Sequence, residues 1–473
     1  MKAHVAIVSA SLAVVLVQSS FGQFSDFTPV PNSAGPIPIG GPGEATPMTL
    51  GHPGWLQATI ADRATQNTLV PNSNSGNWDM ITANETGSNA GRYLFMPFET
   101  GTAGVQRIDL QDPNYNTRTT TIIAPGTQGF VSGDASRWTP YGTYLTAEES
   151  WSAGSSKGRL FEVTNPTTAG ANAGTFVQRT VIPRVSHEGL AFDSNKALYF
   201  VDELNGGSIY KYVPANPNAT NGNDYFAAGQ TFALKVGSGG QNEGASGAAI
   251  TGSSSWVAIT DLNGSQLAGV SVLAGDGTVD GRATADVASV SATGYNRPED
   301  MEIQVLPNGD QMLYFATTDV ANNGGNGRVY NLNLTSGEVK LFADAASTDL
   351  ASNAGAGGAF RNPDNLAIDS QGNMYIIEDR GGGVDDDIWF AKDLNFDGDL
   401  LDTGEGIARW ASNGTQGSEF TGLYFDKFDS NLAYVNIQHP SSGVDRTIQV
   451  TVPEPSTLGA LAIAGVLAIR RRR

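Results

Sequence analysis

The chain has 473 residues, of which 40% are hydrophobic and 16% are charged. It can bury a large core, and its length alone corresponds to two or three domains, although a repeat architecture can make it one large domain. The absence of Cys excludes disulfide bonds and thiolate metal ligands. With 58 Gly and 22 Pro, the composition favours short strands joined by turns, so we predict an all-β body.

The N-terminus has the three parts of a secretory signal peptide. Lys2 precedes an apolar run over residues 5–17, and the small residues Ser20 and Gly22 occupy the positions that a signal peptidase reads. We therefore predict a signal peptide over residues 1–22 that is cleaved after Gly22.

The C-terminus also reads as a processing segment. Pro453-Glu454-Pro455 precedes a mostly apolar stretch over 457–469 and four arginines. As a helix this stretch would span only about 20 Å, which is short for a bilayer. Residues 451–473 resemble the PEP-CTERM sorting signal, and an ordinary tail anchor is the alternative. The resemblance implies removal by an exosortase and export to the outer surface, extracellular matrix or periplasm of a Gram-negative-type bacterium.

Removing both ends makes the protein more acidic. It takes away Lys2, four arginines and Glu454, which leaves 22 basic and 46 acidic residues and a formal charge near -24. Such a surface repels nucleic acid and anionic lipid, and it suits divalent cations. We expect a monomer that binds no nucleic acid.

A hairpin pattern recurs along the chain, in which an aromatic-rich strand often ends on a carboxylate. Taking one aromatic position per unit as a marker gives 93, 144, 199, 256, 314, 375 and 434, with intervals of 51 to 61 residues. This regular spacing predicts a β-propeller over residues 80–450 with six or seven blades of about 50–60 residues. A pair of sandwiches is the alternative. Residues 23–79, rich in Pro and Gly, read as a lead-in that is loosely ordered up to residue 54.

Two short motifs are candidates for a functional site. In Arg297-Pro298-Glu299-Asp300, an extended backbone would direct Arg297 and Glu299 to the same side, although a surface ion pair is the alternative. In Ser186-His187-Glu188, the carboxylate is the better candidate, since a lone His is more often a packed core residue. Few His and many carboxylates favour hard cations over zinc.

A third motif resembles a calcium-binding loop. The sequence from 393 to 399 has the first, third and fifth ligands and the sixth-position Gly of an EF-hand-type loop, but its twelfth position is Gly404 and Glu405 follows one place late. We predict a second calcium site here, and a solvated acidic turn is the alternative. The predicted ligands are Asp393, Asn395, Asp397 and Asp399.

Taken together, several segments resemble the alkaline phosphatase PhoX family over about residues 80–445. The segments that carry the resemblance are 139–149, Ser186-His187-Glu188, Arg297-Pro298-Glu299-Asp300, 362–365, 419–422 and 436–440. The resemblance implies a secreted propeller that hydrolyses phosphomonoesters at Ca²⁺ and iron ions in its central channel. It also implies that Arg297 holds a phosphoryl oxygen while Glu188 and Glu299 bind metal, which makes these three the predicted catalytic residues.

Carboxylates of the repeat units are predicted as the metal ligands. The predicted set is Glu99, Asp134, Glu149, Glu188, Glu299, Asp364 and Asp379. The chain departs from the family at Asp134, where the family has its iron-binding Cys. Ca²⁺ is therefore the expected cofactor, and the loss of the thiolate argues against iron.

The sequence is compatible with two main classes of function, one catalytic and one non-catalytic. The first is an exported phosphoesterase that acts on a small phosphate ester. The second is a non-catalytic, calcium-binding propeller of the cell surface or matrix. A different hydrolase on the same scaffold, such as a lactonase, is a third reading, and fold alone does not separate them.

Overall fold

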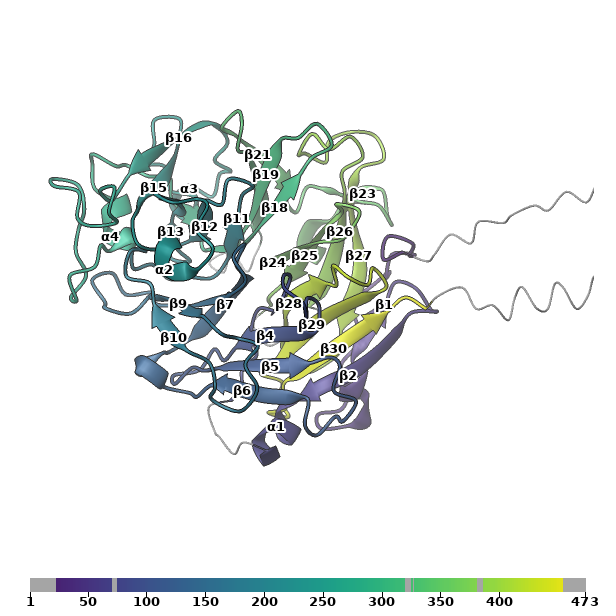
Figure 1. The fold of residues 1–473 in the computed structure, drawn as a ribbon. Helices are drawn as coiled ribbons and strands as arrows, with labels where there is room; N and C mark the ends of the chain where they lie inside the picture. Colours follow the sequence, from purple (N-terminus) through teal and green to yellow (C-terminus); the bar gives the residue numbers. More distant parts are fainter. Residues whose placement is uncertain (1–22, 70–74, 320–324, 326, 381–385, 454–473) are drawn as a thin grey trace, which may run out of the picture.

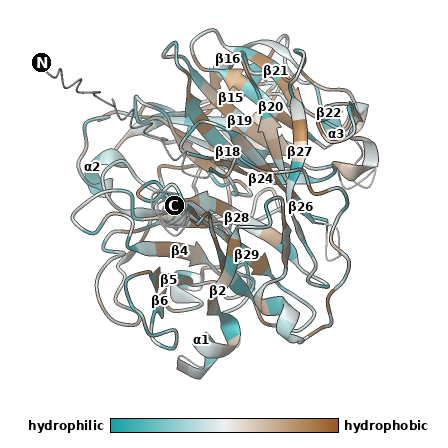
Figure 2. Ribbon diagram, turned by 90° about the vertical axis from the view of Figure 1, so that its right-hand side faces the viewer, coloured by the Kyte–Doolittle hydropathy of each residue, from teal (hydrophilic) through white to brown (hydrophobic). Residues whose placement is uncertain are grey.

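The computed structural model describes residues 23–69, 75–319, 325, 327–380 and 386–453. The predicted signal peptide and all but the first three residues of the sorting segment lie outside these ranges. Six antiparallel units of four strands each surround a common centre, three as separate sheets and three within larger sheets, and they form the blades of a β-propeller (Figure 1). Figure 2 shows apolar colouring concentrated along strands, with more hydrophilic colouring in many of the connecting loops.

The blades are numbered here in chain order, and each is given from its innermost strand outward. Blade 1 consists of β3 (Thr82–Ala83), β4 (Tyr93–Pro97), β5 (Val105–Asp109) and β6 (Thr119–Ile123). Blade 2 consists of β7 (Gly133–Trp138), β8 (Tyr144–Glu148), β9 (Leu160–Val163) and β10 (Phe176–Gln178). Blade 3 consists of β11 (Leu190–Phe192), β12 (Leu198–Val201), β14 (Ile209–Pro214) and β15 (Gly229–Val236).

The second half of the ring repeats this plan. Blade 4 consists of β18 (Pro298–Val305), β19 (Gln311–Thr317), β20 (Arg328–Asn333) and β21 (Glu338–Ala343). Blade 5 consists of β24 (Pro363–Ile368), β25 (Met374–Glu378), β26 (Asp387–Lys392) and β27 (Gly406–Asn413). Blade 6 consists of β28 (Glu419–Phe425), β29 (Leu432–Gln438), β30 (Arg446–Thr451) and β2 (Leu56–Asp62).

The ring closes in two ways. Each innermost strand contacts the innermost strand of the next blade, and β28 contacts β3 to complete the circle. The N-terminal strand β2 supplies the outer strand of the last blade, pairing with β30 from Leu56↔Thr451 to Asp62↔Arg446. Because the two ends of the chain share one sheet, blade 6 exists only when the whole ring has formed.

The spacing of the aromatic markers fits the structure at six of its seven positions. Six markers lie in the second strand of a blade, whereas Trp256 lies in β16 (Gly252–Ala258). This extra strand pairs with β15 and with β21, and so joins blades 3 and 4 into one continuous sheet. The described part of the chain therefore has six blades, with an insertion between the third and the fourth.

The remaining elements are short. Outside the blades lie β1 (Met48–Leu50), β13 (Asn205–Gly207), β17 (Tyr295–Asn296), β22 (Thr348–Asp349) and β23 (Ala354–Gly355). The helices are α1 (Arg63–Leu69), α2 (Gly222–Tyr225), α3 (Glu243–Ser246) and α4 (Gly281–Ala285), with short 3-10 turns at Pro42–Ala45, Thr127–Gly129 and Gly357–Ala359. None of the helices within the described ranges combines the length and apolar character that crossing a membrane requires.

The N-terminal segment is packed, and the prediction that residues 23–54 are loosely ordered is wrong. Phe24 and Trp55 lie in the core cluster between blades 5 and 6, and the Trp410 indole donates to the carbonyl of Phe24 at 3.0 Å. β1 pairs with the outer edge of β27. Burying a large apolar side chain stabilises the fold by roughly 1.5–3 kcal/mol, which outweighs the weak strand signal of a Pro- and Gly-rich segment.

Candidate metal and phosphate site

Carboxylates gather at the end of the channel where the innermost strands begin. One set stands at or just before the start of an innermost strand: Asp79, Asp134, Glu188, Glu299 and Asp364. A second set stands just after the second strand of a blade: Glu99, Glu149, Glu203 and Asp379. Antiparallel neighbours place these two positions side by side. We call both sets, together with Glu419 at the start of β28, the acidic pole.

A repeated backbone device holds the acidic pole in place. Asn77, Ser132, Arg297 and Asn362 each lie two residues before a strand-start carboxylate, and each has a positive φ between 39° and 51°. Their carbonyls accept the N–H that follows the second strand, for example Glu99 to Asn77 at 2.8 Å. In blade 4 this donor is Thr318, so the strand-end position there carries a hydroxyl and Asp319 comes one residue later.

Three of these carboxylates already form a potential coordination site. Oxygen atoms of Glu188, Glu299 and Asp364 all lie within 4.8 Å of one another. They come from blades 3, 4 and 5. The amide of Asn365 donates to Glu188 at 3.4 Å and to Asp364 at 2.9 Å, which fixes two of the three side chains. The structure thus brings together three sequence-predicted residues that lie far apart in the chain.

Burial makes the ionised form of the pole unfavourable. Removal from water, together with neighbouring carboxylates, raises the pKa of Asp134, Glu188 and Asp364 well above the usual range. The same causes raise the pKa of Glu99 to about 8. Buried carboxylates in such number require compensating positive charge to ionise together.

The donor set fits hard cations. Asp134 Oδ1 and Glu188 Oε2 are buried and accept no hydrogen bond from the described residues, so each is available as a ligand. Carboxylate oxygens without thiolate or clustered imidazole suit Ca²⁺ and Mg²⁺ best. The remaining predicted ligands, Glu99, Glu149 and Asp379, lie in the strand-end set beside them.

Arg297 brings positive charge into the acidic pole. Its Nε lies 3.2 Å from Glu203 Oε1, its Nη2 also contacts that oxygen, and Nη2 lies 3.4 Å from Glu299 Oε1. Although burial alone lowers the pKa of Arg297, Glu299 and Glu203 raise it above the usual value. The guanidinium is therefore permanently charged and lies within reach of an anion at the pole.

Trp151 covers this arginine from the solvent side. The Arg297 guanidinium lies 4.9 Å from the centre of the Trp151 ring, and the indole N–H donates to Glu203 at 3.0 Å and also to Glu149. The loop that carries Trp151 is held by the buried Arg282 of α4, which donates to the carbonyls of Ser150 and Ser155 at 2.7 and 2.9 Å. The insertion between blades 3 and 4 thereby supports the rim of the site.

Four members of the site escape the sequence-based prediction. These are Asp79, Glu203, Glu419 and His439. Gln438 donates to Asp79 at 3.0 Å and to Glu99 at 2.8 Å, which places Asp79 in the pole, and His439 contacts Glu419 at 2.8 Å. A regular spacing could have found two of them: positions 79, 134 and 188 are 55 and 54 residues apart, and 99, 149 and 203 are 50 and 54 apart.

The predicted second calcium loop lies apart from the pole, in the turn after β26. Asp393 accepts backbone N–H groups of Phe396 and Gly398 at 2.7 and 3.1 Å, and Asp399 pairs with Lys340 at 3.0 Å. Glu405, one place late for the motif, accepts from the backbone of Leu394 and Asp402 instead. Calcium binding by this loop stays a prediction.

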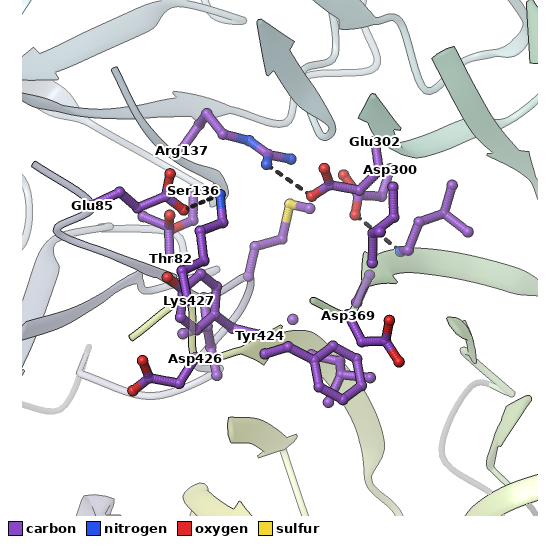
Figure 3. A pocket seen from close by; sticks show the side chains of 18 of the residues that line it. Thr82, Glu85, Ser136, Arg137, Asp300, Glu302, Asp369, Tyr424, Asp426 and Lys427 are labelled. Atoms are coloured by element: carbon purple, nitrogen blue, oxygen red, sulfur yellow. Dashed lines mark hydrogen bonds and ion pairs between the residues drawn. The ribbon is translucent and has the colours of Figure 1, made fainter. Parts of the chain in front are cut away.

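A cavity lies at the other end of the channel. It has a volume of about 390 Å³ and is lined by residues farther along the innermost strands, such as Arg137, Glu302 and Tyr424 (Figure 3). It contains none of the carboxylates of the acidic pole. The cavity is therefore separate from the site that the carboxylates form.

The fold and the pole define a six-bladed propeller with a carboxylate-rich channel end. The family model for alkaline phosphatase PhoX matches residues 129–441, well over half of the chain. The protein therefore belongs to this family. The PEP-CTERM protein-sorting motif matches residues 451–473. No curated protein sequence matches at a significant level.

A solved structure supports the fold. The PhoX of Pseudomonas fluorescens in complex with vanadate, a transition state analogue, is similar with a TM-score of 0.60 and 16% identity, covering 90% of this chain and 98% of that one. A gluconolactonase from Xanthomonas campestris is similar with a TM-score of 0.42 and 10% identity, covering 90% and 100%. At these identities the likeness to PhoX shows the β-propeller fold alone.

Proposed function

We propose that the protein is an exported, metal-dependent phosphoesterase that hydrolyses phosphomonoesters at the acidic pole. The observation that carries the proposal is Arg297, a charged guanidinium in contact with Glu203 and Glu299 beside the Glu188, Glu299 and Asp364 group. Family membership supports the reaction class, and the sorting motif supports export. The substrate is a small phosphate ester.

The carboxylates of the pole would hold the cations. Glu188, Glu299 and Asp364 form the first group, and Glu99, Asp134, Glu149 and Asp379 lie around it. When bound, Ca²⁺ would supply Lewis-acid chemistry and neutralise charge on the phosphoryl group. Since no Cys is present, iron would have to bind through carboxylates alone.

The chain's own residues would then bind and orient the ester. Arg297 would exchange one of its carboxylate contacts for a phosphoryl oxygen, a geometry that suits its planar fork of donors. Glu299 would restrain the guanidinium through their ion pair, and the Trp151 ring would restrain it from the other face. The buried pole limits the access of water to the reacting group.

The direct test uses purified protein, bound-metal analysis and a chromogenic phosphomonoester with added Ca²⁺ at alkaline pH. We expect turnover that falls by about 10²-fold or more in Arg297→Ala and Glu299→Gln, because each removes charge at the reacting centre. Matched controls are Arg179→Ala and Glu162→Gln, a buried ion pair at 2.5 Å elsewhere. Equal losses in both pairs of variants would attribute the effect to stability and contradict the proposal.

Because Asp134 replaces the family's iron-binding Cys, a second candidate function is a calcium-binding propeller of the cell surface or matrix without catalysis. Stoichiometric Ca²⁺ with no turnover of any phosphomonoester would support it. The variant Asp134→Cys separates the two candidates further. Iron binding or a gain of activity in this variant would identify position 134 as the altered ligand.

Export and processing complete the proposal. We infer that an exosortase removes the C-terminal segment and that the propeller acts outside the cytoplasm, at the outer surface, in the extracellular matrix or in the periplasm. The loop of Asp393, Asn395, Asp397 and Asp399 would bind a separate, structural Ca²⁺. Calcium titration of Asp397→Asn, which should lose one site without losing activity, tests this assignment.

A further inference from the structure

The cavity of about 390 Å³ at the end of the channel opposite the acidic pole is a second candidate binding site, and we call it the far-mouth cavity. Its walls come from five of the six innermost strands, β3, β7, β18, β24 and β28, and from the turn after β28. Most of its lining residues are buried, so it is a recess in the channel and not a shallow surface feature. Its volume lies within the range of about 300–1,000 Å³ that small-molecule sites occupy.

Two ion pairs stand at the rim and link different blades, as Figure 3 shows. Arg137 of blade 2 contacts Glu302 of blade 4 at 2.8 Å. Lys427, after β28 of blade 6, contacts Glu85, after β3 of blade 1, at 2.7 Å. Both cations of the lining are therefore already neutralised.

Three further carboxylates line the cavity with no Lys or Arg at ion-pair distance among the described residues. Asp300 accepts the backbone N–H groups of Met301 and Leu366, and Asp426 accepts those of Phe428 and Asp429. Asp369 is held in the same way by its own turn. The lining thus holds five carboxylates and two cations, so carboxylates outnumber cations in the cavity.

Apart from Thr82, Ser136 and Ser370, the rest of the wall is mostly apolar. Its side chains include Met80, Ile81, Leu366, Leu423 and Phe425. An anion would be repelled by the unpaired carboxylates, and a sugar-like ligand would find few polar partners among these side chains.

We propose that the far-mouth cavity binds a small organic cation with an apolar body, such as an alkylammonium or arylammonium compound. The ammonium group lies among the rim carboxylates, and the apolar body covers the floor. This site is independent of the acidic pole and of the proposed hydrolysis.

A matched pair of probes tests the proposal: hexylammonium and hexanoate share a carbon skeleton and differ in charge. Calorimetric titration of the full protein with excess Ca²⁺, which fills the acidic pole, should show one hexylammonium site and binding roughly tenfold tighter than that of hexanoate. Equal or tighter binding of hexanoate would overturn the proposal.

Two variants locate the site. Asp426→Asn with Glu302→Gln removes two rim charges while an amide oxygen remains to accept the same hydrogen bonds, so hexylammonium should bind several-fold more weakly. Ser370→Trp, at an exposed lining position, should abolish binding by filling the mouth. The control Asp261→Asn removes a charge from an exposed turn elsewhere. Unchanged hexylammonium affinity in both site variants would place the binding elsewhere and contradict the proposal.

Discussion

At the residue scale, Trp151 connects carboxylates of two blades with Arg297, the proposed anion-binding group. Its N–H contacts carboxylates from blades 2 and 3, and its ring faces Arg297. Such outer-shell donors orient metal ligands, and their loss commonly weakens metal binding by about 10–100-fold. Trp151 is therefore a positioning residue of the proposed site, although it is 47% exposed.

Two substitutions separate the roles of Trp151. Trp151→Phe keeps the ring over Arg297 but removes the donor, so Ca²⁺ affinity should fall by about tenfold with little change in KM for a phosphomonoester. Trp151→Ala should in addition raise KM, because Arg297 loses its restraint. Calcium titration and steady-state kinetics measure the two effects. Trp256→Phe is the control, since Trp256 is partly exposed on β16, and equal effects at both positions would refute the assignment.

At the element scale, the innermost strands approach so closely that side chains are excluded at the contact. A Cβ on Gly422 in β28 would lie 2.4 Å from the backbone nitrogen of Ile81, and its φ is +57°. Gly443 also has a positive φ, +71°, but has open space around it. An alanine at either position would therefore strain the backbone. Only an alanine at Gly422 would also clash across the contact between blades 6 and 1.

This difference gives a stability prediction for the ring closure. Gly443→Ala should lower the free energy of unfolding by about 1 kcal/mol, the cost of a non-Gly residue in the left-handed region. Gly422→Ala should lower it by about 2–4 kcal/mol, because the clash adds to that strain. Urea denaturation measures both values. Equal losses of unfolding free energy in the two variants would show that β28 and β3 move apart at no energetic cost, which would contradict the prediction.

The sequence predicts these elements as far as local pattern allows. Alternation and aromatic spacing identify the second strand of every blade, because those residues are buried in each repeat. Trp256 follows the same pattern in a bridging strand, since spacing alone does not distinguish a blade strand from an inserted one. The packing of Phe24 and Trp55 depends on surfaces that exist only after blades 5 and 6 have formed.

The sequence predicts that carboxylates form the site, and it identifies some of them by residue. Glu188, Glu299 and Asp364 were predicted from motifs, and the structure places their oxygens together. The repeat spacing could have identified Asp79 and Glu203, whereas the place of Glu419 in the pole depends on which strand ends meet when the ring closes. The role of Asp300 differs from that of its neighbour Glu299, since alternation along β18 directs it to the far-mouth cavity.

At the scale of the whole molecule, the acidic pole should couple stability to pH, and the proposed metal binding should couple it to cations. Burial raises the pKa of Glu99 from 4.5 to about 8, and raises that of Asp134 and Glu188 as well. The metal-free folded state therefore holds protons that the unfolded chain releases above pH 4.5. This contribution to stability is complete below pH 4.5 and is lost as the pH rises through about 8.

The metal-free protein should accordingly show a Tm that falls between pH 5 and pH 8, whereas saturating Ca²⁺ should flatten or reverse the decline. In the proposed site the cation would bind the ionised carboxylates of the folded state only, and at about 100 times its Kd it would add about 2.7 kcal/mol. Thermal unfolding with Ca²⁺ or with a chelator, at several pH values and constant ionic strength, measures the effect. Parallel Tm profiles in the two conditions would mean that the pole holds no cation, because only a ligand that binds the ionised form can change the slope.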